Sequence, residues 1–153
     1  MAERVSTTRY LSFTLGDEIY GVPVERVEVV LEMQAITRVP NAKPQIRGVI
    51  NHRGSVVPVV DPRVSFDAGL TPLGEESSII VMQLIYEGET LTAGVLADNV
   101  SEVLDLADAE LEAPPLVSGG GRDSFVRNIA RQGERFIVLL DIDATLLAAE
   151  GRS

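Results

Sequence analysis

The residues best suited to chemistry lie in one stretch, "GVINHRGSVVPVVD", which runs from Gly48 to Asp61. It contains His52, the single histidine of the chain, between Asn51 and Arg53. A histidine can act as a general base, but it then needs a nucleophile or an acid partner, and none stands at a recognisable catalytic spacing. The sequence therefore predicts a solvated turn at His52, with Arg53 exposed at the hairpin tip. A small β-barrel enzyme that uses His52 is the less favoured alternative.

The other residues of the chain do not match the pattern of a metal site or of a phosphate-binding loop. One histidine, no cysteine and scattered carboxylates give no spacing typical of a transition-metal site. The glycine-rich segment "SGGGRDS" at 118–124 lacks the lysine and the serine or threonine that end a phosphate-binding loop. We therefore expect no catalytic residue, no metal site and no cofactor, and we interpret 118–124 as a loop.

Composition limits the class of protein and of partner. With 153 residues, 45% of them hydrophobic, the chain can form one compact domain or two small subdomains that share a seam. Thirteen basic and 23 acidic residues give a net charge of −10, which repels nucleic acid and anionic membrane surfaces. The amino terminus has no apolar signal-peptide core, and no apolar run approaches the roughly 20 residues that span a bilayer. We expect a cytoplasmic protein with no nucleic-acid partner and no direct membrane insertion.

Short β-strands are the elements that must position the stretch around His52. Alternating or apolar runs flank short polar turns in two places, which is typical of hairpins: 10–15 with 19–24, and 78–86 with 90–97. A further apolar run closes the chain at 135–142. Helical patterning is limited to single turns near 24–30 and 98–104 and to 143–150, where Asp143 is the expected N-cap. The sequence therefore predicts a mainly β, all-β fold with a short C-terminal helix.

A weak internal repeat organises these strands. Moving the sequence by 73 positions places Gly21 on Gly94, and further downstream the segment 46–61 resembles 126–141. Both segments contain a polar turn with glycine and a strand that ends in aspartate, but the second lacks histidine. The hairpin therefore has a geometric role that does not require His52. Two copies with several short strands each predict two small Greek-key or SH3-like barrels packed side by side.

Three segments resemble the CheW-like domain of bacterial chemotaxis coupling proteins, in that family's order and spacing: "YLSFTLGDEIYGVPVERVEVV", "ITRVPNAKPQIRGVINHRGSVVPVVDPR" and "AGVLADNVSEVLDL". The resemblance covers Tyr10 to about Leu147. It implies a single CheW-like domain at residues 8–150, made of two intertwined, five-stranded, SH3-like β-barrel subdomains.

The resemblance also implies a function without enzymatic activity. Such a protein is a scaffold that couples chemoreceptors, the methyl-accepting chemotaxis proteins, to the histidine kinase CheA. An alternative keeps the fold and changes the pathway: a coupling protein of a twitching-motility or other non-flagellar chemosensory array.

Three groups of site residues follow from the resemblance. The CheW-like regulatory domain of the kinase would dock on the first barrel at Ile36, Thr37, Arg38, Arg47, Gly48 and Val56. The cytoplasmic tip of a chemoreceptor would bind in the seam between the barrels at Val27, Val30, Arg53, Val100 and Val103. A second kinase contact would lie at Glu112, Leu116 and Val117.

Two features of these groups remain open at the level of sequence. The seam valines recur at every third residue, a pattern that fits core packing as well as an exposed groove. Val29 stands where the family often places a glutamate that pairs with the turn arginine, here Arg53. In an extended strand Glu28 points to the opposite face, so Glu32 or an acid of another chain would have to replace that partner.

Overall fold

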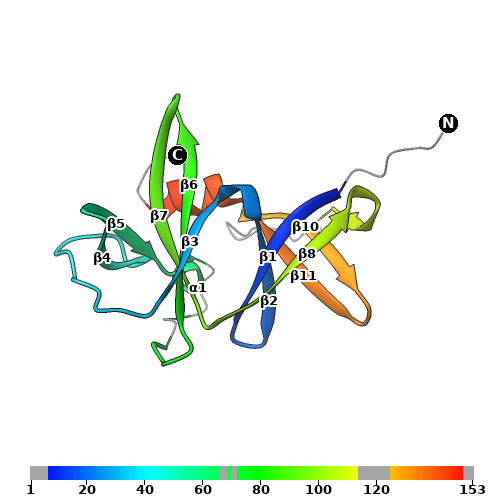
Figure 1. The fold of residues 1–153 in the computed structure, drawn as a ribbon, viewed down its shortest axis with the longest axis horizontal. Helices are drawn as coiled ribbons and strands as arrows, with labels where there is room; N and C mark the ends of the chain where they lie inside the picture. The colour runs from blue at the N-terminus through cyan, green and yellow to red at the C-terminus, as the bar shows by residue number, and fades with distance from the viewer. Residues whose placement is uncertain (1–6, 66–68, 70–71, 114–124, 150–153) are drawn as a thin grey trace.

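The computed structural model describes residues 7–65, 69, 72–113 and 125–149. Within these residues the chain forms two mixed β-sheets that lie side by side along the long axis of the molecule (Figure 1). The first sheet has the strand order β8-β1-β2-β11-β10-β9. Its strands are β1 (Thr7–Leu15), β2 (Glu18–Pro23), β8 (Asn99–Ala107), β9 (Leu111–Glu112), β10 (Val126–Gln132) and β11 (Arg135–Leu140).

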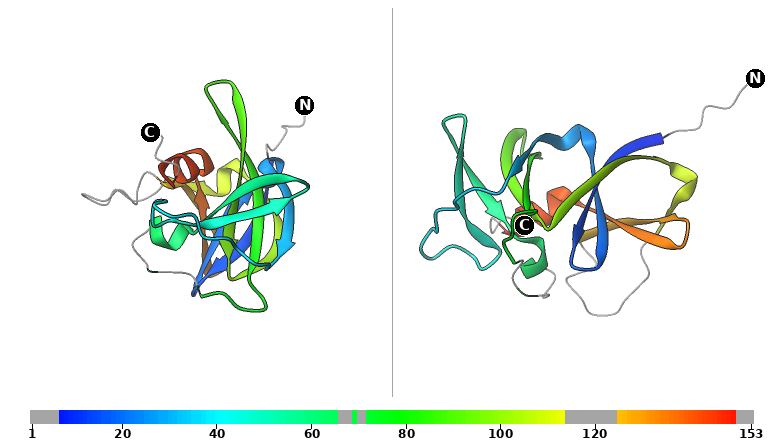
Figure 2. Two further views of the ribbon diagram at one scale, coloured as in Figure 1. Left: turned by 90° about the vertical axis from the view of Figure 1, so that its left-hand side faces the viewer. Right: turned by 60° about the horizontal axis from the view of Figure 1, so that its bottom comes forward.

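The second sheet has the strand order β3-β6-β7-β5-β4. Its strands are β3 (Val27–Glu32), β4 (Ile46–His52), β5 (Ser55–Val60), β6 (Ser78–Tyr86) and β7 (Glu89–Ala97). The β6–β7 hairpin extends beyond the body of this sheet, as Figures 1 and 2 show. This mainly β architecture confirms the predicted fold class.

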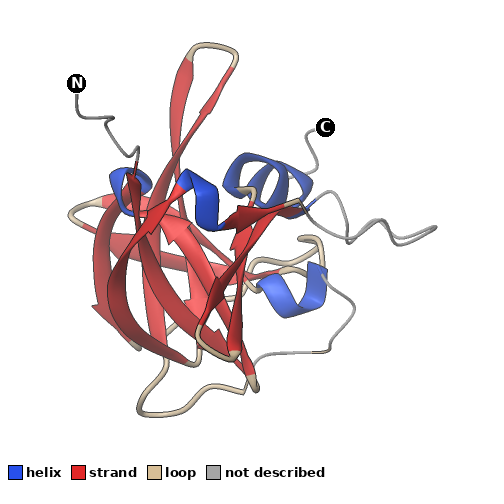
Figure 3. Cartoon of the chain, turned by 90° about the vertical axis from the view of Figure 1, so that its right-hand side faces the viewer, coloured by secondary structure: helices blue, strands red, loops and turns tan. Residues whose placement is uncertain are grey.

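Helical structure in the described part of the chain is short (Figure 3). It consists of the 3-10 turns η1 (Val24–Arg26) and η2 (Asp108–Glu110) and the helices α1 (Pro62–Ser65) and α2 (Ile142–Ala149). The C-terminal helix was predicted, but the prediction of Asp143 as its cap is wrong. The Asp141 carboxylate accepts a hydrogen bond from the Ala144 amide at 3.0 Å, because the helix begins one residue earlier than predicted. None of the described helices is long and apolar enough to cross a membrane.

The predicted repeat is present in the strand pairing. Each half of the chain contributes strands to both sheets, and β5 pairs with β7 in parallel just as β11 pairs with β2. The bulges repeat as well: Arg47 is the extra residue in β4 opposite β5, and Arg127 is the extra residue in β10 opposite β11. The two halves are therefore intertwined.

Two glycines at equivalent positions of the repeat have the same packing role. A Cβ at Gly21 would lie 2.8 Å from Leu139 Cδ2, and a Cβ at Gly94 would lie 2.6 Å from Ile79 Cγ2. Both glycines lie in the parallel strand pairs that join the two halves, with Leu139 opposite Gly21 and Val59 opposite Gly94. A side chain of a neighbouring strand thus accounts for glycine at both positions: Leu139 of β11 at Gly21, and Ile79 of β6 at Gly94.

Three clusters of buried side chains form the core of the described residues. One lies within the first sheet, around Tyr10, Leu104 and Ile137, and one within the second, around Ile50, Val59 and Val81. The third and largest is shared, because it combines Phe13 of the first sheet with Met82 of the second and Leu146 of α2. Period-two alternation along β6 supplies both neighbouring cores, since Ile79 and Val81 face one cluster and Ile80 and Met82 face the other.

Candidate functional site

The stretch around His52 is the β4–β5 hairpin. Arg53 and Gly54 form its turn with φ values of 53° and 82°, and positive φ at both central residues is the type I′ geometry that suits a two-residue hairpin. The Asn51 side-chain oxygen accepts a hydrogen bond from the Gly54 amide at 2.9 Å. Arg53 is exposed at the tip, as predicted, and makes no ion pair within 4 Å to any described residue.

His52 is not the solvated residue that the sequence predicted. Its side chain is only 14% exposed, and its Nε2 atom is buried without a hydrogen-bond partner among the described residues. Along β4 the side chains of Ile50 and His52 fall on the same face, and Ile50 belongs to the core of the second sheet. The alternation along β4 therefore indicates that His52 is buried, although the polar residues of the turn suggested that it was solvated.

The Glu28 carboxylate lies 3.9 Å from His52 Nε2, although β3 and β4 stand at opposite edges of the sheet order. The contact shows that the sheet curls until its edges approach each other. The expectation that Glu28 faces opposite to Val29 fails because Glu28 is the extra residue of a bulge in β3, which breaks strict alternation. Among the described residues Glu28 makes its contact with His52 and no ion pair with Arg53. Val29 instead packs against the core of the second sheet.

The surroundings of His52 do not form a catalytic constellation. A groove at this end of the barrel is lined by Glu28, His52, Ser55, Thr90 and other residues, so an acid, a histidine and hydroxyl groups share it. No described hydroxyl is hydrogen-bonded to the imidazole, and a base that activates a nucleophile requires that contact. Nor do the described residues contain a group of three or more metal-ligating side chains that could hold an ion.

The predicted kinase-binding residues fall into two places on the second sheet. Ile36, Arg38 and Arg47 line one groove beside the arch, the connection at residues 33–45 that joins β3 to β4. Val56 lies near the tip of the β4–β5 hairpin, where it lines the groove beside His52. Val56 is 73% exposed, more than any other large apolar side chain described. The structure thus separates Val56 from Arg47 along one hairpin.

Thr37 and Gly48 have structural roles in this region. Thr37 donates to and accepts from the Val49 backbone at 2.9 and 2.8 Å, which holds the arch against β4. Gly48 is buried with φ at 146°, and a Cβ on it would lie 2.2 Å from the Thr37 carbonyl oxygen. Gly48 therefore permits the close approach of the arch and is not itself an exposed contact.

The seam valines divide into two pairs. Val27 and Val100 are half-buried and pack against the shared core between the sheets. Val30 and Val103 are exposed, on the edge strands β3 and β8. The two pairs thus have different roles: Val27 and Val100 contribute to core packing, and Val30 and Val103 are available to a partner. Arg53 lies apart from both, at the tip of the β4–β5 hairpin.

The predicted second kinase contact is only partly described. Glu112 ends β9 and is exposed, and its carboxylate lies 3.9 Å from Arg131, whose guanidinium stands 5.3 Å from the centre of the Phe136 ring. Phe136 is exposed and occupies the position in β11 that Val56 occupies in β5. Leu116 and Val117 lie outside the described residues.

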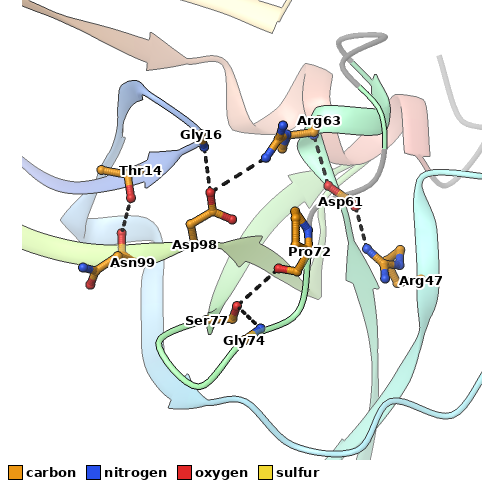
Figure 4. A network of polar contacts seen from close by, with 10 residues as sticks. All are labelled: Thr14, Gly16, Arg47, Asp61, Arg63, Pro72, Gly74, Ser77, Asp98 and Asn99. Carbon is orange, nitrogen blue, oxygen red and sulfur yellow. Dashed lines mark hydrogen bonds and ion pairs between the residues drawn. The ribbon is translucent and has the colours of Figure 1, made fainter.

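A polar network that the sequence did not predict joins the two sheets at the base of the β4–β5 hairpin (Figure 4). Asp61, whose side chain is completely buried, accepts hydrogen bonds from Arg47 at 2.8 Å and from the Arg63 amide at 3.2 Å. The Arg63 guanidinium lies 3.8 Å from Asp98, which accepts a hydrogen bond from the Gly16 amide at 2.7 Å. The charged groups that fix Arg47 are therefore connected to the β1–β2 turn of the other sheet.

Comparison with known proteins agrees with this architecture. The CheW-like domain family model matches residues 9–150. The chain is 31% identical over 141 residues to the chemotaxis protein CheW of Klebsiella aerogenes, covering 92% of this chain and 82% of that protein. It is also 30% identical over 147 residues to protein FrzA of Myxococcus xanthus, covering 94% and 88%.

A solved structure shares the fold. The scaffolding protein TtCheW from Thermoanaerobacter tengcongensis superposes with a TM-score of 0.80 at 28% identity, covering 95% of this chain and 91% of that one. The intertwined halves, the repeated hairpins and the family match over residues 9–150 show that this chain belongs to the CheW-like domain family.

Proposed function

We propose that this protein is a non-enzymatic chemotaxis adaptor, a single CheW-like domain at residues 8–150 that couples chemoreceptors to the histidine kinase CheA in the cytoplasm. The observation that carries the proposal is the family match over residues 9–150. The name of the solved relative, a scaffolding protein, supports the adaptor role over an enzymatic one. An adaptor needs exposed, reversible binding surfaces, and the exposed apolar side chains of Val56 and Val103 are suited to this role.

The CheW-like regulatory domain of the kinase docks, in this proposal, on the second sheet. Ile36, Arg38, Arg47 and Val56 supply contacts, while Thr37 and Gly48 fix the arch that presents them. The chemoreceptor tip binds at the seam, where Val30 and Val103 face the partner and Val27 and Val100 support them from the shared core. Arg53 adds an exposed charge to receptor binding, and Glu112, Leu116 and Val117 form the second kinase contact.

Co-sedimentation with receptor-containing membranes and purified kinase tests the proposal. Wild-type protein is expected to sediment with the membranes and to bring the kinase with it. Val56→Asp would bury an unpaired carboxylate on docking, at a cost of several kcal/mol, so it should still bind receptor but lose the kinase.

Ile85→Asp is the matched control, because Ile85 is also an exposed aliphatic residue but lies near the tip of the β6–β7 hairpin, outside the proposed surfaces. The reverse pattern is expected of Val103→Asp, which should keep the kinase in solution and lose the receptor. A folded Val56→Asp variant that binds kinase as well as Ile85→Asp does would remove Val56 from the interface.

A further inference from the structure

Within the described residues the chain passes between the two sheets at two connections, and each leads into an edge strand. The first crossing is η1 (Val24–Arg26), which joins β2 of the first sheet to β3 of the second. The second crossing is Asp98, which joins β7 of the second sheet to β8 of the first. β3 and β8 carry Val30 and Val103, the exposed valines of the seam. The two crossings therefore determine where each seam strand begins.

An ion pair holds the second crossing to α1 (Figure 4). The Asp98 carboxylate lies 3.8 Å from the Arg63 guanidinium and accepts a hydrogen bond from the Gly16 amide at 2.7 Å. Arg63 belongs to α1, which follows β5 of the second sheet, and Gly16 lies in the β1–β2 turn of the first. The crossing is thus bound both to the sheet that it leaves and to the sheet that it enters.

The first crossing has the same arrangement with the charges exchanged. The Arg26 guanidinium forms an ion pair with Asp143 of α2, and its Nε atom donates a hydrogen bond to the Gln83 carbonyl at 2.9 Å. α2 follows β11 of the first sheet, and Gln83 lies in β6 of the second. This crossing too is bound both to the sheet that it leaves and to the sheet that it enters.

The internal repeat relates the two ion pairs. Asp61 and Asp141 follow equivalent strands, and Arg63 and Asp143 are each the second residue of the helix that comes next. Their charges are opposite, and so are the charges of the two crossing residues that they contact. Equivalent positions with opposite charges, each facing its complement, indicate that the contact itself has a role in both halves.

We propose that Arg63 and Asp143 are positioning residues for receptor binding, each of which fixes the start of one seam strand: β8 for Arg63 and β3 for Asp143. Val30 and Val103 lie on these two strands, so their relative position depends on both crossings. A partner that contacts both valines binds best when the two strands are held in place beforehand. The inference rests on the proposed function, in which the chemoreceptor tip binds at the seam. Arg63 and Asp143 lie outside the residues proposed to contact either partner.

Binding of the full chain to receptor-containing membranes and to purified kinase, measured separately, tests the proposal. Arg63→Met and Asp143→Asn each remove one charge on the helix side and leave the hydrogen bonds of the crossings to Gly16 and Gln83 in place. Each should weaken receptor binding by about threefold or more and keep kinase affinity within about twofold of wild type, an effect of the order that ion-pair networks produce. Arg63→Lys and Asp143→Glu keep the charges and should restore most of the receptor affinity.

Net charge does not account for this expected result. Arg63→Met and Asp143→Asn change the net charge in opposite directions, yet both should weaken receptor binding. Arg127→Met is the matched control for Arg63→Met, because Arg127 is an exposed arginine of β10 outside both crossings and outside the proposed contact surfaces. It should stay within about twofold of wild type for both partners, since exposed charges contribute little.

Amide hydrogen exchange, followed by NMR, tests the two ion pairs without any partner. Arg63→Met should speed exchange at the start of β8 by about threefold or more, and Asp143→Asn should do the same at the start of β3. In each variant the other strand should exchange as in wild type, because each ion pair holds one crossing. Arg127→Met should change neither strand.

The measurements separate the possible failures. Failure of the wild-type protein to bind receptor membranes would refute the proposed function and the receptor role of both ion pairs, whereas hydrogen exchange would still decide whether they hold the strands. Equal losses of receptor and kinase affinity, with a lowered melting temperature, would show that the pairs only stabilise the fold and would overturn the inference. Unchanged receptor binding in folded Arg63→Met and Asp143→Asn, or wild-type exchange at both strands, would also overturn it, with the adaptor role intact.

Discussion

Gly48 is predicted to be among the positions of the proposed kinase-binding surface that are most sensitive to substitution, although it has no side chain to contact a partner. Its φ of 146° is one that residues with a Cβ rarely adopt, at a cost of about 1 kcal/mol or more. An added Cβ would also lie 2.2 Å from the Thr37 carbonyl oxygen and 2.7 Å from Ile36 Cγ2. Relief requires the arch to move away from β4, and such overpacking typically costs about 1–3 kcal/mol. We therefore expect Gly48→Ala to lose roughly 2–4 kcal/mol of unfolding free energy.

A matched substitution separates the two contributions. Gly54 also has positive φ, at 82°, but a Cβ there would meet nothing within 4 Å. Gly54→Ala should therefore lose only the conformational part, about 1 kcal/mol. In a domain of this size each kcal/mol lowers the melting temperature by about 2–4 °C. The expected decreases are thus roughly 5–15 °C for Gly48→Ala and a few degrees for Gly54→Ala.

Urea unfolding followed by circular dichroism, combined with kinase binding below the transition, provides the assay. Gly48→Ala should lose kinase affinity even where it is fully folded, because the displaced arch no longer presents Ile36 and Arg38. Gly54→Ala should retain affinity close to wild type. If Gly48→Ala unfolds at the same urea concentration as Gly54→Ala, the contact between the arch and β4 is not the constraint described above, and the reasoning fails.

Four further predictions concern individual side chains. Val27→Ala should lower the unfolding free energy by roughly 1–2 kcal/mol, because Val27 packs on the shared core. Val103 is 51% exposed, so Val103→Ala should lose less than about 0.5 kcal/mol of unfolding free energy but more receptor affinity than Val27→Ala. Equal urea midpoints for the two variants would contradict this. Asp61→Ala should cost about 3–5 kcal/mol in thermal unfolding, since it leaves a partly buried arginine without its carboxylate, and a loss below 1 kcal/mol would argue against that role. Arg53→Gly should gain up to about 1 kcal/mol of unfolding free energy, because φ at Arg53 is positive and glycine adopts positive φ without strain. A marked loss of unfolding free energy would show that the Arg53 side chain stabilises the fold. His52→Leu should retain receptor and kinase binding with equal or higher stability, since it removes a buried nitrogen that lacks a partner, and loss of the adaptor function would revive a chemical role for His52.

Local patterns in the sequence were sufficient to predict the hairpins, but not the edge strands: the segments 24–30 and 98–104 were expected to contain helical turns, and the structure has β3 and β8 there, with only the 3-10 turn η1 before β3. Polar turns containing glycine, such as Arg53–Gly54, fix which neighbouring strands pair, because the backbone of a two-residue turn depends on its own residues. The repeat that relates 46–61 to 126–141 was likewise readable, and both segments became hairpins with a bulge at the same position. The exposure of Arg53 followed from the turn alone.

Tertiary structure decided the contacts between segments far apart in the sequence. Curling of the second sheet brought Glu28 to His52, and a bulge in β3 re-aimed Glu28 against the alternation of an ideal strand. The link from Arg63 to Asp98 depends on how the two sheets pack. The register of parallel pairs and the packing of sheet edges are set by the whole chain, so no local pattern encodes them.

The same distinction applies to the interaction surfaces. The sequence alone identified the β4–β5 hairpin and the seam valines as candidates, because the resemblance fixed their positions along the chain. Only the structure separated Val56 from Arg47, buried Gly48 beneath the arch and divided exposed Val103 from half-buried Val27. Exposure is a property of what packs on a residue from elsewhere in the chain, and in this fold the covering strands come from both halves of the repeat.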